Sequence, residues 1–224
     1  MKVLVTGATS GIGFELVKQL RAEQHEVFAT GRTTEKLIEL QDITGCHIGA
    51  YDLSDSQHVI DMFSDATNTL GGLDVLVNNA GMNSAKRAID EISVEEIDLQ
   101  YAINLKAPMI LCREALSLMK TQQSGYIINV TSTVAKRASE TMSVYTSMKQ
   151  GLSGFTGVLM KEAQPHGIKV TNLLPGGTDT NFREASRPQY MKPESVARTV
   201  IGLLKLPDDV IMHEMVFRPQ VEVE

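Results

Sequence analysis

A tyrosine, a lysine and a serine in the second half of the chain have the types and the spacing for proton transfer. Tyr145 and Lys149 are four residues apart in a segment, 143–166, whose pattern predicts a helix, and such a pair shares one helix face. A tyrosine hydroxyl has a pKa of about 10 and transfers protons poorly at neutral pH. A positive charge beside it favours the phenolate and lowers that pKa. Tyr145 is therefore a candidate general acid or base, with Lys149 as its electrostatic partner.

Ser132 is the third candidate. It follows the apolar run 126–130, which predicts a strand, so its hydroxyl would stand at the strand's C-terminal end and could hold a carbonyl oxygen. The tyrosine and lysine pair also fits an exposed tyrosine lying beside a lysine. The catalytic interpretation therefore requires a cofactor at the same edge of the sheet.

The first thirteen residues supply a candidate phosphate cradle. Residues 2–6 predict a strand, and an amphipathic helix follows the turn. Small residues in such a turn let the backbone approach a pyrophosphate, whose charge suits a helix N-terminus. The glycine spacing differs from the usual G-x-G-x-x-G motif, and glycines also mark ordinary tight turns. The candidate contacts are Gly7, Thr9, Ser10, Gly11, Ile12 and Gly13.

The end of the predicted second strand, residues 26–30, indicates the cofactor. A carboxylate there would bind an adenosine ribose and repel a 2′-phosphate. The sequence instead places Arg32 after the strand, with no acid at its tip, and a guanidinium can pair with a phosphate. A surface arginine on a turn is the alternative. The missing acid favours NADP over NAD.

Two further predicted strands end in candidate cofactor contacts. After residues 47–51 come Asp52, which could contact an adenine amino group or serve only as a turn residue, and Leu53. After residues 73–77 comes a run of small residues that would admit the flat side of an adenosine or ribose: Asn79, Ala80 and Gly81.

The later part of the chain completes the candidate site. Asn104 lies in a predicted helix, 94–120, where a buried amide requires partners; it could satisfy backbone groups at a kink, hold a water beside Lys149, or do both. A sixth predicted strand, 167–174, ends in a turn suited to cover a nicotinamide ring. The turn's candidate contacts are Pro175, Gly176, Thr178 and Thr180.

Composition limits the class of protein. The chain has 224 residues and a formal net charge of −6, which predicts one α/β domain and disfavours nucleic acid or a membrane as partner. Two cysteines and the lack of a signal-peptide pattern or long apolar span predict a cytoplasmic protein. The five histidines are scattered without ligand spacing, so no metal site is expected.

With these motifs in register, the chain resembles the short-chain dehydrogenase/reductase family over nearly its whole length. The resemblance rests on the glycine motif, the Asn78–Gly81 run, Pro175-Gly176 and the residues Asp74, Asn104, Ser132, Tyr145 and Lys149. It implies a Rossmann-type, doubly wound parallel sheet of about seven strands, a single domain over residues 1–224 and a substrate loop at about residues 178–192. It also implies a nicotinamide cofactor and a homodimer or homotetramer.

The resemblance also assigns roles. Tyr145 would be the acid in reduction and the base in oxidation, and Ser132 would orient the carbonyl. Lys149 would lower the pKa of Tyr145 and bind the nicotinamide ribose, while Asn104 would hold a water that links Lys149 to solvent. Arg32 resembles the NADP-preferring members, although Ser10 stands where many of them carry a base.

The sequence thus predicts an NADP(H)-dependent oxidoreductase that interconverts a carbonyl and a secondary alcohol by hydride transfer. The substrate is a small molecule that the sequence does not select: an oxoacyl thioester, a hydroxy acid, a ketone or an aldehyde. One alternative is a regulatory or sensor protein of the same fold that binds NADPH with little catalysis. Another is an epimerase or dehydratase that uses the cofactor transiently.

Overall fold

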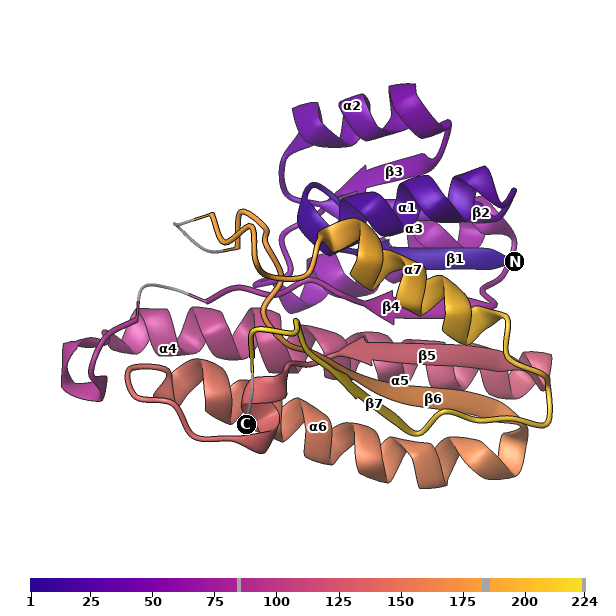
Figure 1. Ribbon diagram of the computed structural model, residues 1–224. Helices are drawn as coiled ribbons and strands as arrows, with labels where there is room; N and C mark the ends of the chain where they lie inside the picture. Colours follow the sequence, from indigo (N-terminus) through magenta and orange to yellow (C-terminus); the bar gives the residue numbers. More distant parts are fainter. Residues whose placement is uncertain (84–85, 183–185, 223–224) are drawn as a thin grey trace.

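Seven short runs rich in β-branched and apolar residues form one sheet, and all of its strand pairs are parallel. The computed structural model describes residues 1–83, 86–182 and 186–222 and is shown in Figure 1. The order across the sheet is β3-β2-β1-β4-β5-β6-β7. The strands are β1 (Lys2–Thr6), β2 (Glu26–Gly31), β3 (His47–Ala50), β4 (Val75–Asn78), β5 (Gly125–Val130), β6 (Ile168–Pro175) and β7 (Glu214–Phe217).

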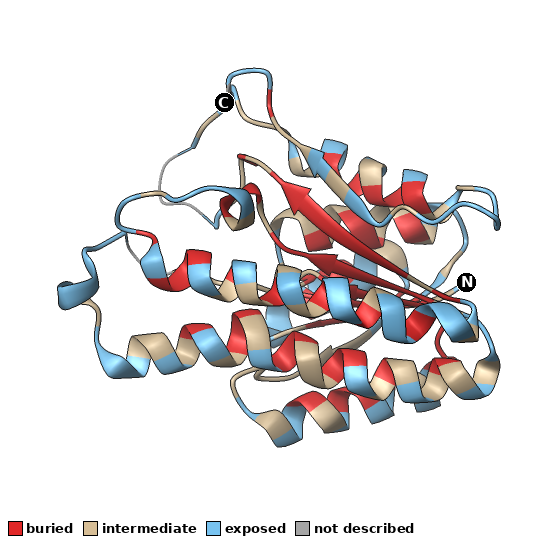
Figure 2. Cartoon of the chain, turned by 90° about the horizontal axis from the view of Figure 1, so that it is seen from below, coloured by how far each residue is buried: buried red, intermediate tan, exposed pale blue. Residues whose placement is uncertain are grey.

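Helices cover both faces of this sheet. One buried cluster joins the sheet to α1 (Gly11–Ala22), α2 (Thr34–Thr44) and α7 (Pro193–Leu204). A second cluster joins the opposite face to α3 (Ser56–Leu70), α5 (Ala107–Gln122) and α6 (Ser143–Ala163). Figure 2 shows the strands buried between the helices, whose outer faces are exposed.

The alternation of side chains along each strand explains why helices are needed on both sides. Val3 and Val5 belong to the first cluster, whereas Leu4 between them belongs to the second. Successive strand residues point to opposite faces, so a strand that is apolar throughout buries its side chains only in a three-layer structure. The doubly wound α/β fold predicted from the sequence is confirmed.

The strand order changes direction beside β1. The chain builds β2 and β3 on one side of β1 and then returns to place β4 on the other. In open parallel sheets a crevice forms outside the carboxyl ends of the strands at such a switch point. The glycine turn after β1 and the Asn79–Gly81 segment after β4 therefore meet at one edge.

One predicted helix is interrupted. The expected helix 94–120 consists of α4 (Val94–Tyr101), one π-helical turn (Ala102–Lys106) and α5, which ends at Gln122. Pro108 in the first turn of α5 has no N–H to donate to the preceding turn. The regular i to i−4 hydrogen bonding of an α-helix is therefore interrupted at this residue. The other predicted elements agree with the structure to within about three residues at each end, the usual uncertainty of such boundaries.

Across the ranges given above, no helix is both long and apolar enough to cross a membrane.

Candidate functional site

The glycine turn after β1 has a backbone conformation and close contacts that require glycine. Gly7 and Gly11 adopt positive φ angles of 66° and 56°, a region that favours glycine. A Cβ on Gly7 would stand 2.7 Å from the Ala80 Cα, and one on Gly13 would stand 2.6 Å from the Asn79 Nδ2 and closer still to the Gly7 carbonyl oxygen. The turn is therefore folded tightly enough that its backbone, rather than side chains, faces the crevice.

Hydrogen bonds fasten this turn to the segment after β4. The Thr6 Oγ1 accepts from the backbone N–H groups of Asn79 at 3.0 Å and Ala80 at 2.9 Å. The Asn79 amide donates back to the carbonyl oxygens of Thr6 at 2.9 Å and Gly7 at 3.2 Å. Because its amide is used within the protein, Asn79 shapes the wall of the crevice.

Tyr145 and Lys149 lie on one face of α6, as the spacing predicts. The Lys149 Nζ is 5.8 Å from the centroid of the Tyr145 ring, and both residues are more than 90% buried. The Tyr145 ring also contacts Phe182, with ring centroids 5.9 Å apart and planes tilted by 54°. The phenol therefore lies between a buried ammonium and an aromatic side chain that is 42% exposed.

The environment of Lys149 alters its protonation. Its Nζ donates to the Val130 carbonyl oxygen at 3.1 Å. Removal of the ammonium from water lowers the pKa of Lys149 from 10.5 to about 8, because burial disfavours the charged form. The lysine therefore changes charge close to the pH at which enzymes work.

The structure distinguishes Ser132 from the threonines on either side of it. Thr131 directs its hydroxyl to β6, where it hydrogen-bonds the Asn172 Oδ1 at 2.7 Å and the Leu173 carbonyl oxygen at 3.1 Å, and Thr133 is buried. Ser132 is half-buried at the mouth of the crevice, where its Oγ accepts from the Val134 N–H at 3.3 Å. Its own hydroxyl proton remains available to a ligand oxygen.

Asn104 occupies the π-helical turn and has no exposed surface. Its Oδ1 accepts from the Met82 N–H at 3.0 Å, and its Nδ2 donates to the Met82 carbonyl oxygen at 2.8 Å. The amide thus secures the backbone that follows Gly81, in the segment after β4, instead of backbone groups at the kink of its own helix. A Cβ on Gly81 would stand 3.1 Å from the Asn104 Oδ1 and 3.5 Å from the Lys149 Nζ, so Asn104 and Lys149 flank one glycine.

At the opposite end of the crevice Arg32 is exposed and lines the wall together with Leu53. Asp52 does not line it, and its Oδ1 accepts from the backbone N–H of Ser54 at 2.9 Å and the Ser54 Oγ at 2.8 Å. The Ser54 backbone hydrogen bond, assisted by the Arg32 charge, lowers the pKa of Asp52 below its usual range. Asp52 therefore stays ionised as a turn residue and an electrostatic neighbour of Arg32.

The turn after β6 closes the crevice from the other side. Pro175, Gly176, Thr178 and Thr180 all line it. The Thr180 Cγ2 would be 3.1 Å from a Cβ on Gly11, so this turn meets the glycine turn. The predicted substrate loop, 178–192, continues from here, and its residues 183–185 lie outside the described part of the chain.

Together these segments enclose a crevice of about 470 Å³. Of the predicted site residues, Gly13, Asp52 and Asn104 do not line it and instead support its walls. The crevice also has lining residues not among the predicted contacts: Thr30, Gly31, Tyr51, Asn83, Ile103, Val130, Thr131 and Asn181. Most of them are sequence neighbours of predicted contacts, so extending each predicted segment by one residue would have included them.

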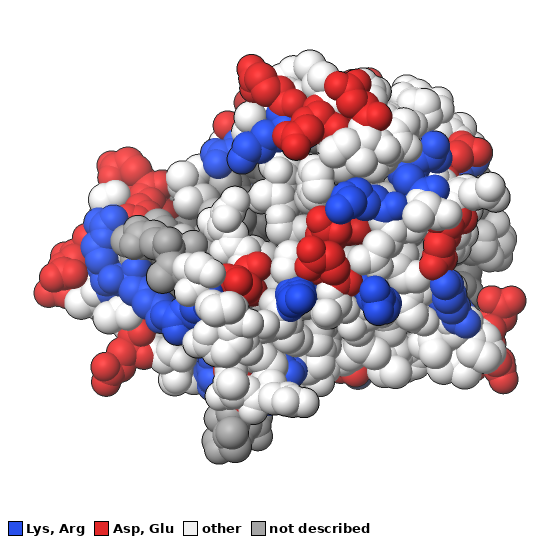
Figure 3. Space-filling view, turned by 45° about the horizontal axis from the view of Figure 1, so that its top comes forward, with Lys and Arg blue, Asp and Glu red and all other residues white. Residues whose placement is uncertain are grey.

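Neither sign of charge dominates the face drawn in Figure 3. Figure 3 shows acidic and basic side chains interspersed on the face that it presents. Within the part of the chain that the structure describes, no group of three or more histidine, cysteine, aspartate or glutamate side chains is placed to hold a metal ion.

Known proteins match this chain in sequence and in structure. The family model of short chain dehydrogenases matches residues 1–191. An uncharacterized oxidoreductase of Staphylococcus aureus is 30% identical over 222 residues, 96% of each chain. The closed form of serine dehydrogenase complexed with NADP+ superposes with a TM-score of 0.93 at 26% identity, covering 100% of this chain and 97% of that one. A metagenomic short-chain oxidoreductase in complex with NADP superposes with a TM-score of 0.88 at 29% identity, covering 99% of this chain and 98% of that one.

Proposed function

The chain belongs to the short-chain dehydrogenase/reductase family, and from this premise we propose that it is an NADP(H)-dependent oxidoreductase that interconverts a carbonyl and a secondary alcohol. The observation that carries the proposal is the position of Ser132, Tyr145 and Lys149 in the same crevice as the glycine turn. A proton donor, a carbonyl-binding hydroxyl and a phosphate cradle are the parts that such a reaction needs from a protein.

The crevice fits a dinucleotide. The glycine turn has no room for side chains at Gly7 and Gly13, and it leads into the N-terminus of α1, which favours a pyrophosphate. Gly81 and Gly176 would let the ribose and the nicotinamide approach the backbone. When bound, the cofactor supplies the hydride; the protein supplies orientation and the proton.

Tyr145 would provide the proton to the carbonyl oxygen in reduction and remove it from the alcohol in oxidation. Ser132 would donate a hydrogen bond to the same oxygen and thereby fix its position. The Lys149 ammonium keeps donors beyond the one used on Val130, which would hold the ribose and favour the phenolate form of Tyr145. Asn104 would keep the Met82 backbone, and with it Gly81, in place beside Lys149.

Preference for NADP rests on Arg32. Its exposed guanidinium stands on the crevice wall, free to pair with a 2′-phosphate, and it precedes α2, whose N-cap residue Thr33 makes no side-chain capping bond. The α2 N-terminus would add a favourable dipole for the same phosphate. The carboxylate of Asp52, which follows β3, accepts hydrogen bonds from Ser54.

Three further expectations belong to this proposal. Residues 1–224 act as one catalytic unit with a substrate loop at residues 178–192, and the protein assembles as a homodimer or homotetramer. It acts on a small molecule in the cytoplasm. Light scattering of the purified protein tests the assembly.

The test is NADPH oxidation across a panel of ketones, aldehydes and oxoacids, and NADP reduction with hydroxy acids and serine. We expect Tyr145→Phe to lose at least about 100-fold in kcat, in line with removal of a general acid, and to bind NADPH within threefold of the wild type. Tyr101→Phe, a change at an exposed tyrosine of α4, is the control. NADPH binding without turnover of any substrate by the wild type would instead indicate the sensor function.

A further inference from the structure

The side-chain amide of Asn172, in the middle of β6, uses its hydrogen-bonding groups on three different elements. Its Oδ1 accepts from the Thr131 Oγ1 at 2.7 Å, and its Nδ2 donates to the Ser153 Oγ at 2.8 Å and to the Glu214 Oε2 at 3.2 Å. Asn172 is only 2% exposed. Because an amide nitrogen has two protons, both donor bonds can form together, and the residue connects the segment that follows β5 with α6 and β7.

Two of these elements carry the reacting groups of the proposed site. Thr131 directly precedes Ser132, and its N–H also donates to the Leu173 carbonyl oxygen at 2.8 Å. Ser153 lies one turn after Lys149 and two turns after Tyr145 on α6, and residues at these spacings share one helix face. A single amide therefore connects the segment that presents Ser132 to the helix that presents Tyr145 and Lys149.

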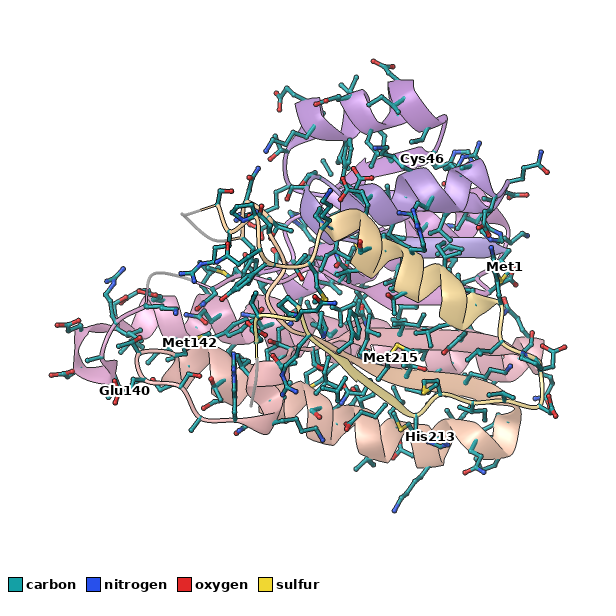
Figure 4. All side chains as sticks on the ribbon, viewed as in Figure 1. Met1, Cys46, Glu140, Met142, His213 and Met215 are labelled. Atoms are coloured by element: carbon teal, nitrogen blue, oxygen red, sulfur yellow. The ribbon has the colours of Figure 1, made fainter. Side chains whose placement is uncertain are left out.

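The third partner closes the arrangement. The Glu214 Oε1 pairs with the Lys136 Nζ at 2.9 Å, and Lys136 ends the 3-10 helix Thr133–Lys136 that follows Ser132. Glu214 is the first residue of β7, which pairs with β6; its chain neighbours His213 and Met215 are labelled in Figure 4. Since the side chains of Lys136 and Glu214 are 45% and 38% exposed, their ion pair contributes little to stability by itself. It nevertheless links the end of the 3-10 helix after Ser132 to Glu214, which also accepts from the Asn172 amide.

We propose that Asn172 is a positioning residue, one that sets the placement of the Ser132 hydroxyl relative to Tyr145 and Lys149. This inference rests on the proposed function. A buried amide in a strand core is costly unless every group is paired, and here each partner belongs to an element next to the reacting side chains. An apolar residue at this position would keep the sheet but leave the Ser132 segment and α6 without a common anchor.

The closing experiment exchanges the amide and the carboxylate. Asn172→Asp places a buried carboxylate against Glu214, so like charges face each other. Adding Glu214→Gln restores a carboxylate–amide pair with the roles reversed. We expect Asn172→Asp to lower kcat at least tenfold with the KM for NADPH within twofold of the wild type, and the double variant to recover most of that loss. Glu214→Gln alone should change kcat less than threefold.

Two variants keep the result interpretable. Thr131→Val removes one hydrogen bond to Asn172 with little change of side-chain volume. It should also lower kcat, and it tests the proposal even if Asn172→Asp does not fold. Tyr126→Phe is the matched control, because it removes a buried side-chain bond of 2.6 Å to Thr171 that joins β5 to β6 away from the crevice. Its kcat should equal that of the wild type.

Hydrogen exchange of residues 132–137 in the cofactor-free protein gives a second readout. The Asn172 and Thr131 variants should exchange at least tenfold faster there, with β1 and α1 unchanged. Folded variants with wild-type kcat and wild-type exchange overturn the positioning role. An inactive wild type would refute the proposed function instead, and the exchange of the 132–137 segment would still decide whether Asn172 holds that segment.

Discussion

Replacement of Lys149 by methionine should stabilise the cofactor-free protein at neutral pH. Methionine has a similar length and no charge. Burial lowers the pKa of Lys149 from 10.5 to about 8, so the folded protein bears a cost for keeping this side chain protonated. At about 1.4 kcal/mol per pKa unit, the cost is about 3 kcal/mol below pH 8.

The sign of the pH dependence follows from the same shift. Between pH 8 and 10.5 the unfolded chain holds a proton on Lys149 that the folded chain has released, so the free energy of unfolding of the wild type rises with pH through this window. In Lys149→Met that contribution is missing. The difference in stability between the variant and the wild type should therefore be largest at pH 7 and decline by about 2 kcal/mol towards pH 9.5.

Urea unfolding of both proteins at half-unit steps from pH 7 to 9.5 measures this difference directly. Loss of the hydrogen bond from the Lys149 Nζ to the Val130 carbonyl oxygen offsets the gain by about 1 kcal/mol at every pH, so the decline with pH is the diagnostic quantity. A stability difference that stays constant to within about 0.5 kcal/mol across this range would refute the reasoning. The variant should also lose NADPH-dependent turnover despite its added stability, as expected for a group retained for function.

Two further changes test the cofactor end of the crevice. Arg32→Ala should weaken NADPH binding about 10- to 100-fold, the value of one charge-assisted bond, and leave NADH binding unchanged; equal losses for both cofactors would contradict a phosphate contact. Gly13→Ala should lower both the Tm and the affinity for NADPH, because its Cβ would overlap the Gly7 carbonyl oxygen and crowd the Asn79 amide. Gly154→Ala is the control, since a Cβ at that exposed α6 position meets nothing within 4 Å; titration by fluorescence and thermal unfolding measure these effects.

Much of the site could be predicted because it depends on local sequence. Strand, glycine turn and helix follow one another within about twenty residues, and the carboxyl ends of parallel strands necessarily meet at one edge. The four-residue spacing of Tyr145 and Lys149 fixes their common face once α6 is helical. Ser132 could be named because it follows an apolar strand, and the structure separates it from its neighbours Thr131 and Thr133, since both threonines are buried and the Thr131 hydroxyl is hydrogen-bonded to β6.

Other features depended on partners far away in the chain. The sequence left open what the Asn104 amide and the Asp52 carboxylate do; in the structure the former holds the Met82 backbone and the latter its own turn. The π-helical turn that places Asn104 and the role of Asn172 were not foreseen. Each of the Asn104 and Asn172 bonds joins residues 19 to 42 positions apart.

The sequence by itself therefore determined the order of elements, the doubly wound sheet and the identity of the residues at its edge, because hydrophobic periodicity and turn chemistry are local properties. Tertiary structure alone decided which polar side chains face the crevice and which support it. An amide or a carboxylate has the same chemistry in both roles, and only the packing of distant strands and helices determines whether its hydrogen-bonding groups are used within the protein or remain available to a ligand.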